Sequence, residues 1–330
     1  MKTIRWGILA TGKIARSFAA DLLLVDTAEL VAIGSRTRAT AQAFAAEFGA
    51  RRAYDSYAGL ADDPDVDVVY VATPHALHRA DVTVCLEAGK AVLCEKALAL
   101  NARDAQAMVD DARSRGLFFM EAMWMRCNPT ILATLEMVRS GAIGDVTAVG
   151  ADFGFRADGP PTSRLFDPAL GASAVLDIGI YPLTFAWLFL GEPVAITSAG
   201  TLSDRGIDLA CSSVLSYADQ STATLSCTTL AATPGRAYVA GTRGRLELGP
   251  SFQTSRSFTV VSDAAEQSYS FEVRGLGYVH EIEEVHRCLR EGRTESSLVP
   301  LDDTVAVMHQ MDLIRHQVGS SLPGDDLDRS

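Results

Sequence analysis

Short apolar runs alternate with helix-like stretches over roughly the first 120 residues. The apolar runs lie at 4–9, 30–33, 66–72, 91–94 and 117–120, and the intervening periodicity predicts helices at 13–24, 39–48, 77–88 and 102–115. Short, continuously apolar strands that alternate with helices are typical of a parallel sheet covered on both faces. We therefore predict an α/β domain with a doubly wound parallel sheet over residues 1–123.

The pattern changes after Trp124. A helix is expected at about 129–139, and strand-like runs follow at 147–155, 194–201, 213–217, 222–228, 237–242 and 258–261. Strands in succession, separated by polar turns, favour an antiparallel sheet. With amphipathic helices near 278–292 and 307–318, residues 124–330 are predicted to form a second, α+β domain.

Composition narrows the class of protein. The chain of 330 residues is 48% hydrophobic and 21% charged, with a formal net charge of −12. A bulk acidic surface argues against nucleic acid and anionic membranes as partners. The six cysteines show no C-x-x-C spacing, as expected for reduced thiols of a cytoplasmic protein. The apolar stretch 183–193 is too short for a membrane span and is broken by Gly191 and Pro193.

The stretch "IRWGILATGKIARSF" has the order strand, tight turn, helix start. A dinucleotide fold uses glycines at this turn so that the backbone approaches a pyrophosphate at a helix N-terminus. Only the middle glycine of G-x-G-x-x-G is present, and alanine takes the turn and packing positions. The context of alternating elements nevertheless predicts a Rossmann cofactor loop made of Ala10, Thr11, Gly12, Lys13 and Ile14.

The second strand ends in Gly34-Ser35-Arg36-Thr37-Arg38. An NAD enzyme typically has an acidic residue here for the ribose 2′-hydroxyl, whereas a hydroxyl with guanidinium groups suits a 2′-phosphate. Ser35, Arg36 and Arg38 therefore predict a preference for NADP(H), with NAD(H) as the alternative. The arginines could also simply stand at the N-terminus of a helix.

Two further strand ends carry polar residues. Thr73, Pro74 and His75 follow one strand, and Glu95 and Lys96 follow the next. Ligands of an open parallel sheet lie at the carboxyl ends of its strands, so both turns should border the cofactor. His75 and His78 form H-x-x-H, but no carboxylate or cysteine beside them completes a metal site, and none is predicted.

Lys96 is the candidate reagent at this edge. Carbonyl reduction needs stabilisation of developing negative charge on oxygen, and an ammonium group supplies charge and a proton. A structural ion pair between Glu95 and Lys96 remains the alternative. In the second domain, Asp177 and Tyr181 are four residues apart and would share one face of a helix. A cation beside a phenol favours proton transfer, but alone Tyr181 also fits an ordinary core aromatic.

Four motifs in order carry a family resemblance: "VLCEKALALN", "RSRGLFFMEAMWMR", "GASAVLDIGIYPL" and "ESSLVPLDDTVAVMHQMDLIR". Together they resemble the Gfo/Idh/MocA oxidoreductases, in the branch of dimeric dihydrodiol dehydrogenases and NADP-dependent D-xylose 1-dehydrogenases. The resemblance covers nearly the whole chain. It implies a Rossmann domain followed by an α+β domain whose large open sheet is often used for dimerisation.

The resemblance also implies roles for individual residues. Lys96 and Tyr181 correspond to the catalytic pair, with Asp177 orienting them or binding substrate hydroxyls. Trp124 and Arg126 would border the substrate pocket. Thr73 and His78 match positions near the cofactor riboses. Pro74, His75, Glu95 and Lys96 are expected to border the cofactor at the same edge of the sheet.

Two departures from the family pattern stand out. The first glycine of the phosphate loop is Ala10, and Ala97 replaces the proline that usually follows the catalytic lysine. Proline restrains its own φ and the residue before it, and an X-Pro bond can be cis. Alanine lacks that restraint, so we expect Lys96 to be held less firmly.

The sequence thus predicts a cytoplasmic NAD(P)-dependent dehydrogenase or reductase acting on CH–OH groups. The expected substrate is a small molecule, namely a sugar, a polyol or a trans-dihydrodiol, and the expected assembly is a homodimer or higher homo-oligomer through the C-terminal sheet. Two alternatives remain open. One is a sugar-modifying enzyme that retains NAD and oxidises transiently to enable elimination or hydrolysis, and the other is a cofactor-sensing regulator.

Overall fold

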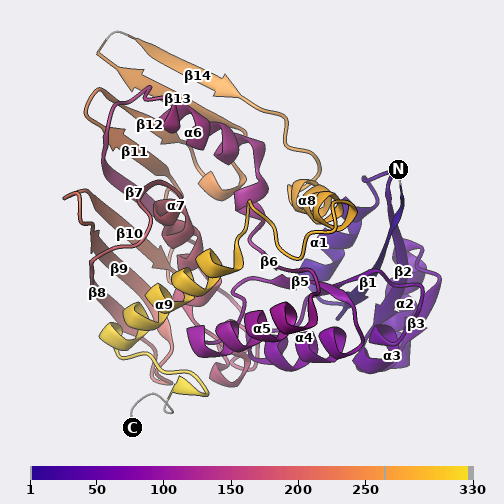
Figure 1. Cartoon of the computed structure of the whole chain (residues 1–330). Coiled ribbons are helices and arrows are strands. Elements are labelled where there is room, and N and C mark those ends of the chain that lie inside the picture. The colour runs from indigo at the N-terminus through magenta and orange to yellow at the C-terminus, as the bar shows by residue number, and fades with distance from the viewer. Residues whose placement is uncertain (1, 264, 326–330) are drawn as a thin grey trace. The chain divides into compact units, whose positions relative to one another are not determined.

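In the computed structural model, which describes residues 2–263 and 265–325, the chain forms two compact units (Figure 1). Unit 1 contains Met1–Ala99, Arg103–Cys127 and Arg274–Val305, and unit 2 contains Leu100–Ala102, Asn128–Val273 and Ala306–Ser330. The expected boundary between residues 123 and 124 lies four residues before the point, after Cys127, where the chain leaves unit 1 for the long segment of unit 2. It does not capture the return of residues 274–305 to unit 1.

Unit 1 is built on a six-stranded sheet in the order β3-β2-β1-β4-β5-β6, and every neighbouring pair is parallel. Its strands are β1 (Ile4–Leu9), β2 (Ala28–Gly34), β3 (Arg52–Tyr54), β4 (Val68–Val71), β5 (Ala91–Glu95) and β6 (Phe119–Ala122). β4 and β5 are buried along their whole length, as strands covered on both faces must be. The predicted doubly wound parallel sheet is confirmed.

Helices connect and cover these strands. They are α1 (Lys13–Leu22), α2 (Arg38–Phe48), α3 (Tyr57–Ala61), α4 (His78–Glu87), α5 (Ala102–Arg115) and α8 (Tyr278–Arg290). Phe18 of α1 stacks on Tyr70 of β4, with ring centroids 3.7 Å apart. α8 packs against α1 although the two are far apart in sequence (Figure 1). The amphipathic pattern predicted this helix, but not that it completes the first unit.

The strand register sets the functional edge of unit 1. Leu9 pairs with Gly34 on one side and with Val71 on the other, and Val71 pairs with Cys94. The residues that follow these strands therefore leave the sheet at the same level. The order of strands reverses between β1 and β4, and ligands of open α/β sheets bind at such a switch point.

Unit 2 contains an eight-stranded sheet in the order β14-β13-β12-β11-β7-β10-β9-β8. Its strands are β7 (Val146–Gly154), β8 (Ala195–Leu202), β9 (Asp208–Ser216), β10 (Thr222–Thr228), β11 (Ala237–Gly241), β12 (Gly244–Leu248), β13 (Ser257–Ser262) and β14 (Glu266–Ser270). β7 and β10 are parallel and all other pairs are antiparallel, which confirms the mostly antiparallel sheet.

Helices pack on the sheet of unit 2, and side chains along β10 alternate between buried and more exposed positions. α7 (Ile180–Leu190) packs against β7 and β10, and α6 (Pro129–Arg139) packs against β13. A π-helical turn, Val175–Gly179, leads directly into α7, and α9 (Leu301–Val318) is the last α-helix of the described residues.

One helical stretch of the described chain, Pro168–Leu190, is long and apolar enough to cross a membrane by length and composition alone. The apolar stretch weighed in the sequence, residues 183–193, covers only the end of this helical stretch and three residues beyond it, so its length was underestimated. Within the protein, 78% of its most apolar window is buried, as in the core helix of a folded domain.

Candidate functional site

The turn after β1 has the geometry of a phosphate-binding loop. Ala10 has a φ of +82°, and its N–H donates to the Gly34 carbonyl at 2.9 Å. Gly12 caps α1 with extended backbone angles and no side-chain hydrogen bond to the helix. A Cβ on Gly12 would meet no atom within 4 Å. The open approach to these uncapped N–H groups fits a dinucleotide pyrophosphate, with Thr11, Lys13 and Ile14 beside it.

A group of hydroxyls marks the end of β2. The hydroxyl of the buried Ser35 lies 2.6 Å from that of Thr40, and Thr37 caps α2 by accepting from the Thr40 N–H. Arg36 and Arg38 are both exposed beside this group. The sequence pointed to Ser35 and the arginines but not to Thr40, which lies in the first turn of α2.

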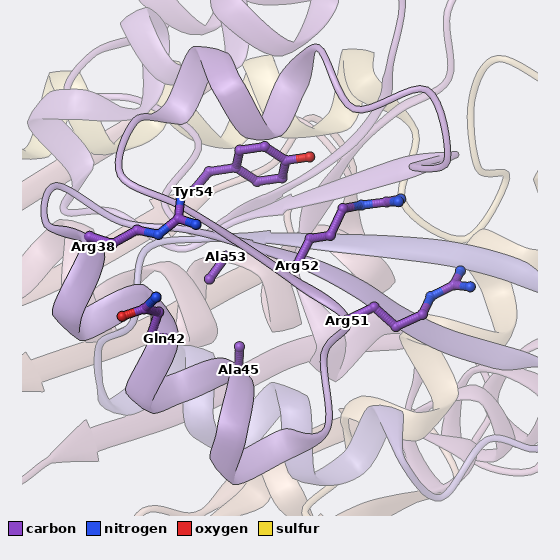
Figure 2. A pocket seen from close by; sticks show the side chains of 7 residues that line it. All are labelled: Arg38, Gln42, Ala45, Arg51, Arg52, Ala53 and Tyr54. Carbon is purple, nitrogen blue, oxygen red and sulfur yellow. The ribbon is translucent and has the colours of Figure 1, made fainter.

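A surface pocket of about 410 Å³ lies between α2 and β3 (Figure 2). It is lined by Arg38, Gln42, Ala45, Arg51, Arg52, Ala53 and Tyr54. Arg51 pairs with Glu29, and Arg52 pairs with Asp63 and Asp65. Within residues 2–263 and 265–325, Arg38 has no such acidic partner, so it is the arginine of this pocket that is available to a phosphate.

The side chains of Thr73 and His78 make their hydrogen bonds within unit 1. The Thr73 hydroxyl donates to Asp81 at 2.7 Å, and Nε2 of His78 lies 2.8 Å from the Thr73 carbonyl. Nδ1 of His78 lies 3.1 Å from the carbonyls of Ala97 and Leu98, and the ring is fully buried. Both ring nitrogens are therefore occupied by the protein. The expected contact of His78 with the cofactor stays a prediction.

His75 and Pro74 occupy the short turn before α4. His75 is buried, and its Nε2 lies 3.1 Å from the carbonyl of Lys96, so the ring supports the segment after β5. The described residues contain no group of three or more histidine, cysteine or acidic side chains that could hold a metal ion.

Glu95 and Lys96 lie where β5 leaves the sheet. Glu95 is buried and accepts a hydrogen bond from the Tyr70 hydroxyl, while its other oxygen accepts from the Lys96 backbone N–H at 3.2 Å. Burial and the neighbouring Glu95 charge raise the pKa of Tyr70 well above its usual value. Lys96 is half-buried, and its peptide bond to Ala97 is cis although no proline follows.

Trp124 and Arg126 follow β6 in a short 3-10 helix, Trp124–Cys127. Trp124 is buried with its ring 5.2 Å from that of Tyr278. Arg126 is also buried; it donates to the Leu298 carbonyl and to Asp303, at 2.6 Å in each case. These bonds join the end of β6 to the 298–303 segment within unit 1, and the expected substrate contact of Arg126 stays a prediction.

Asp177 and Tyr181 belong to unit 2. Asp177 lies in the π-helical turn and Tyr181 in the first turn of α7, so the segment that carries both residues is helical. Asp177 pairs with the half-exposed Arg164 at 2.8 Å, a partner that the sequence did not suggest. Tyr181 is buried with its ring 5.6 Å from that of Phe153.

The π-helical turn is anchored by a buried carboxylate, Asp208. Its oxygens accept from the Ser173 hydroxyl at 2.9 Å, the Val175 N–H at 2.8 Å and the Ser320 hydroxyl at 2.6 Å. Burial raises the pKa of Asp208. π-helical turns are frequent at functional sites, and this one carries Asp177.

The two units match two domains of one protein family. Residues 4–123 match the Gfo/Idh/MocA oxidoreductase family with an NAD-binding Rossmann fold, and residues 131–247 match the C-terminal domain of that family. A trans-1,2-dihydrobenzene-1,2-diol dehydrogenase from Mus musculus is 35% identical over 98% of this chain and 99% of its own length. The chain belongs to the Gfo/Idh/MocA oxidoreductases.

Other proteins are similar to this chain over nearly its whole length. The dihydrodiol dehydrogenase of Xenopus tropicalis is 36% identical, covering 97% of this chain and 99% of its own. Among solved structures, the 3-ketoreductase KijD10 from Actinomadura kijaniata, in complex with NADP and TDP-benzene, is 25% identical with a TM-score of 0.87, covering 97% and 99% of the two chains. The aldose-aldose oxidoreductase of Caulobacter crescentus shares the fold, with a TM-score of 0.88 at 24% identity over 96% of this chain and 97% of its own.

Proposed function

We propose that this oxidoreductase uses NADP(H) to interconvert a carbinol and a carbonyl on a sugar, a polyol or a trans-dihydrodiol. The observation that carries the proposal is the strand register, in which β1, β2, β4 and β5 end side by side. The residues that follow these strands, Gly12, Ser35, Thr73 and Lys96, therefore lie at one edge of a Rossmann sheet. The bound nicotinamide would supply or accept the hydride at C4. The relatives named for trans-dihydrodiol and sugar chemistry support the substrate class.

In this proposal Lys96 and Tyr181 manage the proton. The Lys96 ammonium stabilises negative charge that develops on the substrate oxygen, and the Tyr181 hydroxyl gives or takes the proton. Asp177, held by Arg164, orients substrate hydroxyls. Solved structures of KijD10 include a variant with one lysine replaced by glutamate and another with one tyrosine replaced by phenylalanine, which are the residue types assigned here.

The deciding experiment replaces Lys96 with Met. We expect kcat for NADP⁺ reduction to fall by about 10²–10⁴-fold, the usual contribution of acid–base catalysis, while NADPH binding changes little. The matched control is Lys90→Met. Lys90 precedes the same strand and donates to the carbonyls of Asp63 and Val66, so its loss should affect stability but not turnover. A Lys96→Met enzyme that keeps most of its activity refutes the assignment.

Substrate and chemistry are tested with one panel. NADP⁺ reduction is measured with trans-1,2-dihydrobenzene-1,2-diol, D-xylose, other aldoses and polyols. Turnover on the diol or on a sugar supports the proposal. A protein that purifies with stoichiometric NAD(H) and shows no net reduction of added NADP⁺ would instead favour the alternative hypothesis of a sugar-modifying enzyme that retains NAD.

The preference for NADP(H) rests on Ser35, Arg36 and Arg38. Arg38→Ala should weaken NADPH binding about tenfold or more and leave NADH binding unchanged, because a guanidinium–phosphate contact is lost. Arg51→Ala, at the other end of the same pocket and paired with Glu29, is the control. Equal affinity of the wild-type enzyme for NADH and NADPH would contradict the preference.

We also propose a cytoplasmic homodimer formed through the C-terminal sheet. Val214 of β9 and Tyr238 of β11 are 49% and 42% exposed on strands whose alternate residues are buried. Apolar side chains on such a face suit a second copy of the chain. Light scattering should give twice the chain mass, and Val214→Arg should give the monomer. A wild-type monomer refutes this assembly.

A further inference from the structure

The backbone after β5 is held by side chains from neighbouring strands. Ala97 provides no pyrrolidine ring to restrain this segment, yet each carbonyl from Lys96 to Leu98 lies 3.1 Å from a histidine nitrogen. His75 faces the Lys96 carbonyl, and His78 faces those of Ala97 and Leu98. The expectation that Lys96 would be held loosely therefore needs revision.

His78 links two turns. It is the first residue of α4, its ring is fully buried, and its second nitrogen lies 2.8 Å from the Thr73 carbonyl after β4. Burial lowers the pKa of His78, and its three carbonyl partners act in the opposite direction. All three partners are acceptors, and a neutral ring carries a single N–H. With the proton on Nδ1, His78 donates to the carbonyls of Ala97 and Leu98 after β5, while Nε2 packs against the Thr73 carbonyl after β4.

Glu121 holds the segment from the other side. This residue of β6 is buried; one oxygen accepts the Leu98 N–H at 3.0 Å and the other accepts the Thr304 hydroxyl at 3.0 Å. Burial raises the pKa of Glu121 to about 7, while its two hydrogen bonds act against that rise. An acidic side chain inside a buried strand needs such partners.

We propose that His78 and Glu121 are positioning residues for Lys96. Bonds to the Ala97 carbonyl and to both backbone groups of Leu98 fix the direction in which the chain leaves β5, and thereby the place of the lysine side chain. The inference rests on the proposed function, because it gives these residues a role in turnover only if Lys96 is the reagent. Displacement of a catalytic group by about 1 Å can reduce turnover about 100-fold.

The first test replaces His78 with Phe, which keeps an aromatic ring and removes the ring nitrogens. We expect kcat for NADP⁺ reduction with trans-1,2-dihydrobenzene-1,2-diol or D-xylose to fall about 10- to 100-fold, with NADPH affinity within about twofold of wild type. His286→Phe is the matched control. His286 is a buried histidine of the same unit, bonded to Trp6 and Thr27 and not to the Lys96 segment. It should lose stability and keep its kcat.

Glu121 permits a conservative rescue. In Glu121→Gln, the amide oxygen still accepts from the Leu98 N–H and the amide nitrogen can donate to the Thr304 hydroxyl, so kcat should remain within about threefold of wild type. Glu121→Met has a similar volume and no acceptor, so kcat should fall about 10-fold or more. Equal kcat in the two variants would contradict the role of this hydrogen bond.

A second readout does not depend on turnover. Amide hydrogen exchange of a peptide covering residues 96–98 should be slow in wild type, Glu121→Gln and His286→Phe, and faster in His78→Phe and Glu121→Met. Unchanged exchange in both disruptive variants overturns the proposal, even if neither diol nor xylose is a substrate.

The Lys96→Met enzyme separates this proposal from the proposed function. If Lys96→Met retains turnover, the proposed function fails whatever His78 does. If Lys96→Met is inactive while His78→Phe and Glu121→Met keep their kcat, the function stands and the positioning role fails. If both proposals hold, His78→Phe should not slow the residual rate of Lys96→Met further, because the two residues act as a unit.

Discussion

Gly12 offers a way to disturb cofactor binding without disturbing the fold. Its φ of −73° is accessible to any residue, and an added Cβ would meet no atom within 4 Å. In Gly12→Ala, the weaker helix cap costs about 0.5–1 kcal/mol, and the reduced freedom of the unfolded chain returns about 0.4–1 kcal/mol. The free energy of unfolding should therefore stay within about 0.5 kcal/mol of wild type.

Cofactor affinity should respond quite differently to Gly12→Ala. The methyl group would occupy the space through which the pyrophosphate approaches the backbone, and such overpacking typically costs about 1–3 kcal/mol. At about 1.4 kcal/mol per tenfold, NADPH should bind about 5- to 140-fold more weakly. Titration of protein fluorescence with NADPH measures the Kd, and urea unfolding without cofactor measures stability.

Gly89→Ala is the control with the opposite expectation. Gly89 also has no atom within 4 Å of an added Cβ, but its φ is +72°, and it precedes β5 at the end remote from Lys96. Alanine in this conformation should reduce the free energy of unfolding by about 1 kcal/mol and leave the NADPH Kd unchanged. Wild-type affinity in Gly12→Ala would refute the reasoning about backbone approach.

Three further outcomes follow from the structure. Ala10→Gly should stabilise the protein by about 0.5–1 kcal/mol in urea unfolding, because alanine at a φ of +82° is strained; no gain would contradict that strain. Burial lowers the pKa of His286 to about 4, so the folded state resists its protonation. Between pH 6.5 and 4, wild type should therefore lose about 2 kcal/mol more stability than His286→Gln, and parallel pH curves would refute this. Burial raises the pKa of Glu281 well above normal, and in the described residues neither of its oxygens has a hydrogen-bond partner. Folded protein keeps that proton when unfolded protein loses it, so stability should fall as pH rises above about 4.5, and Glu281→Met should remove this fall in urea unfolding at pH 5–8.

The strands of unit 1 could be predicted because burial on both faces demands continuous apolar runs. The run at 4–9 coincides with β1, and that at 91–94 falls one residue short of the end of β5. β3 (Arg52–Tyr54) was missed because this short edge strand is only partly buried and its sequence needs no apolar run. Pairing in unit 2 depends on contacts distant in sequence, so the parallel pairing of β7 with β10 left no local signal.

The sequence predicted which residues lie at the strand ends, but not which side chains hold the backbone after β5. Strand ends identified Ser35, Thr73 and Lys96, because a parallel sheet places such residues at one edge. The H-x-x-H spacing gives no sign of where the ring nitrogens of His78 lie, so their contacts with the carbonyls of Thr73, Ala97 and Leu98 could not be predicted. Glu121 did leave a signal, since "FFMEAM" places an acid inside an apolar run, as "VLCEK" does at Glu95.

The late return of the chain to unit 1 has a consequence for synthesis on the ribosome. Trp6 lies in the first strand, and its indole N–H donates to His286 of α8, which is translated near the other end of the chain. Until α8 emerges, the indole lacks this acceptor and α1 lacks the helix that packs on it. The nascent Rossmann sheet therefore exposes apolar surface while all of the eight-stranded sheet is being made. A nascent chain of this kind should depend on chaperone protection until synthesis passes residue 290.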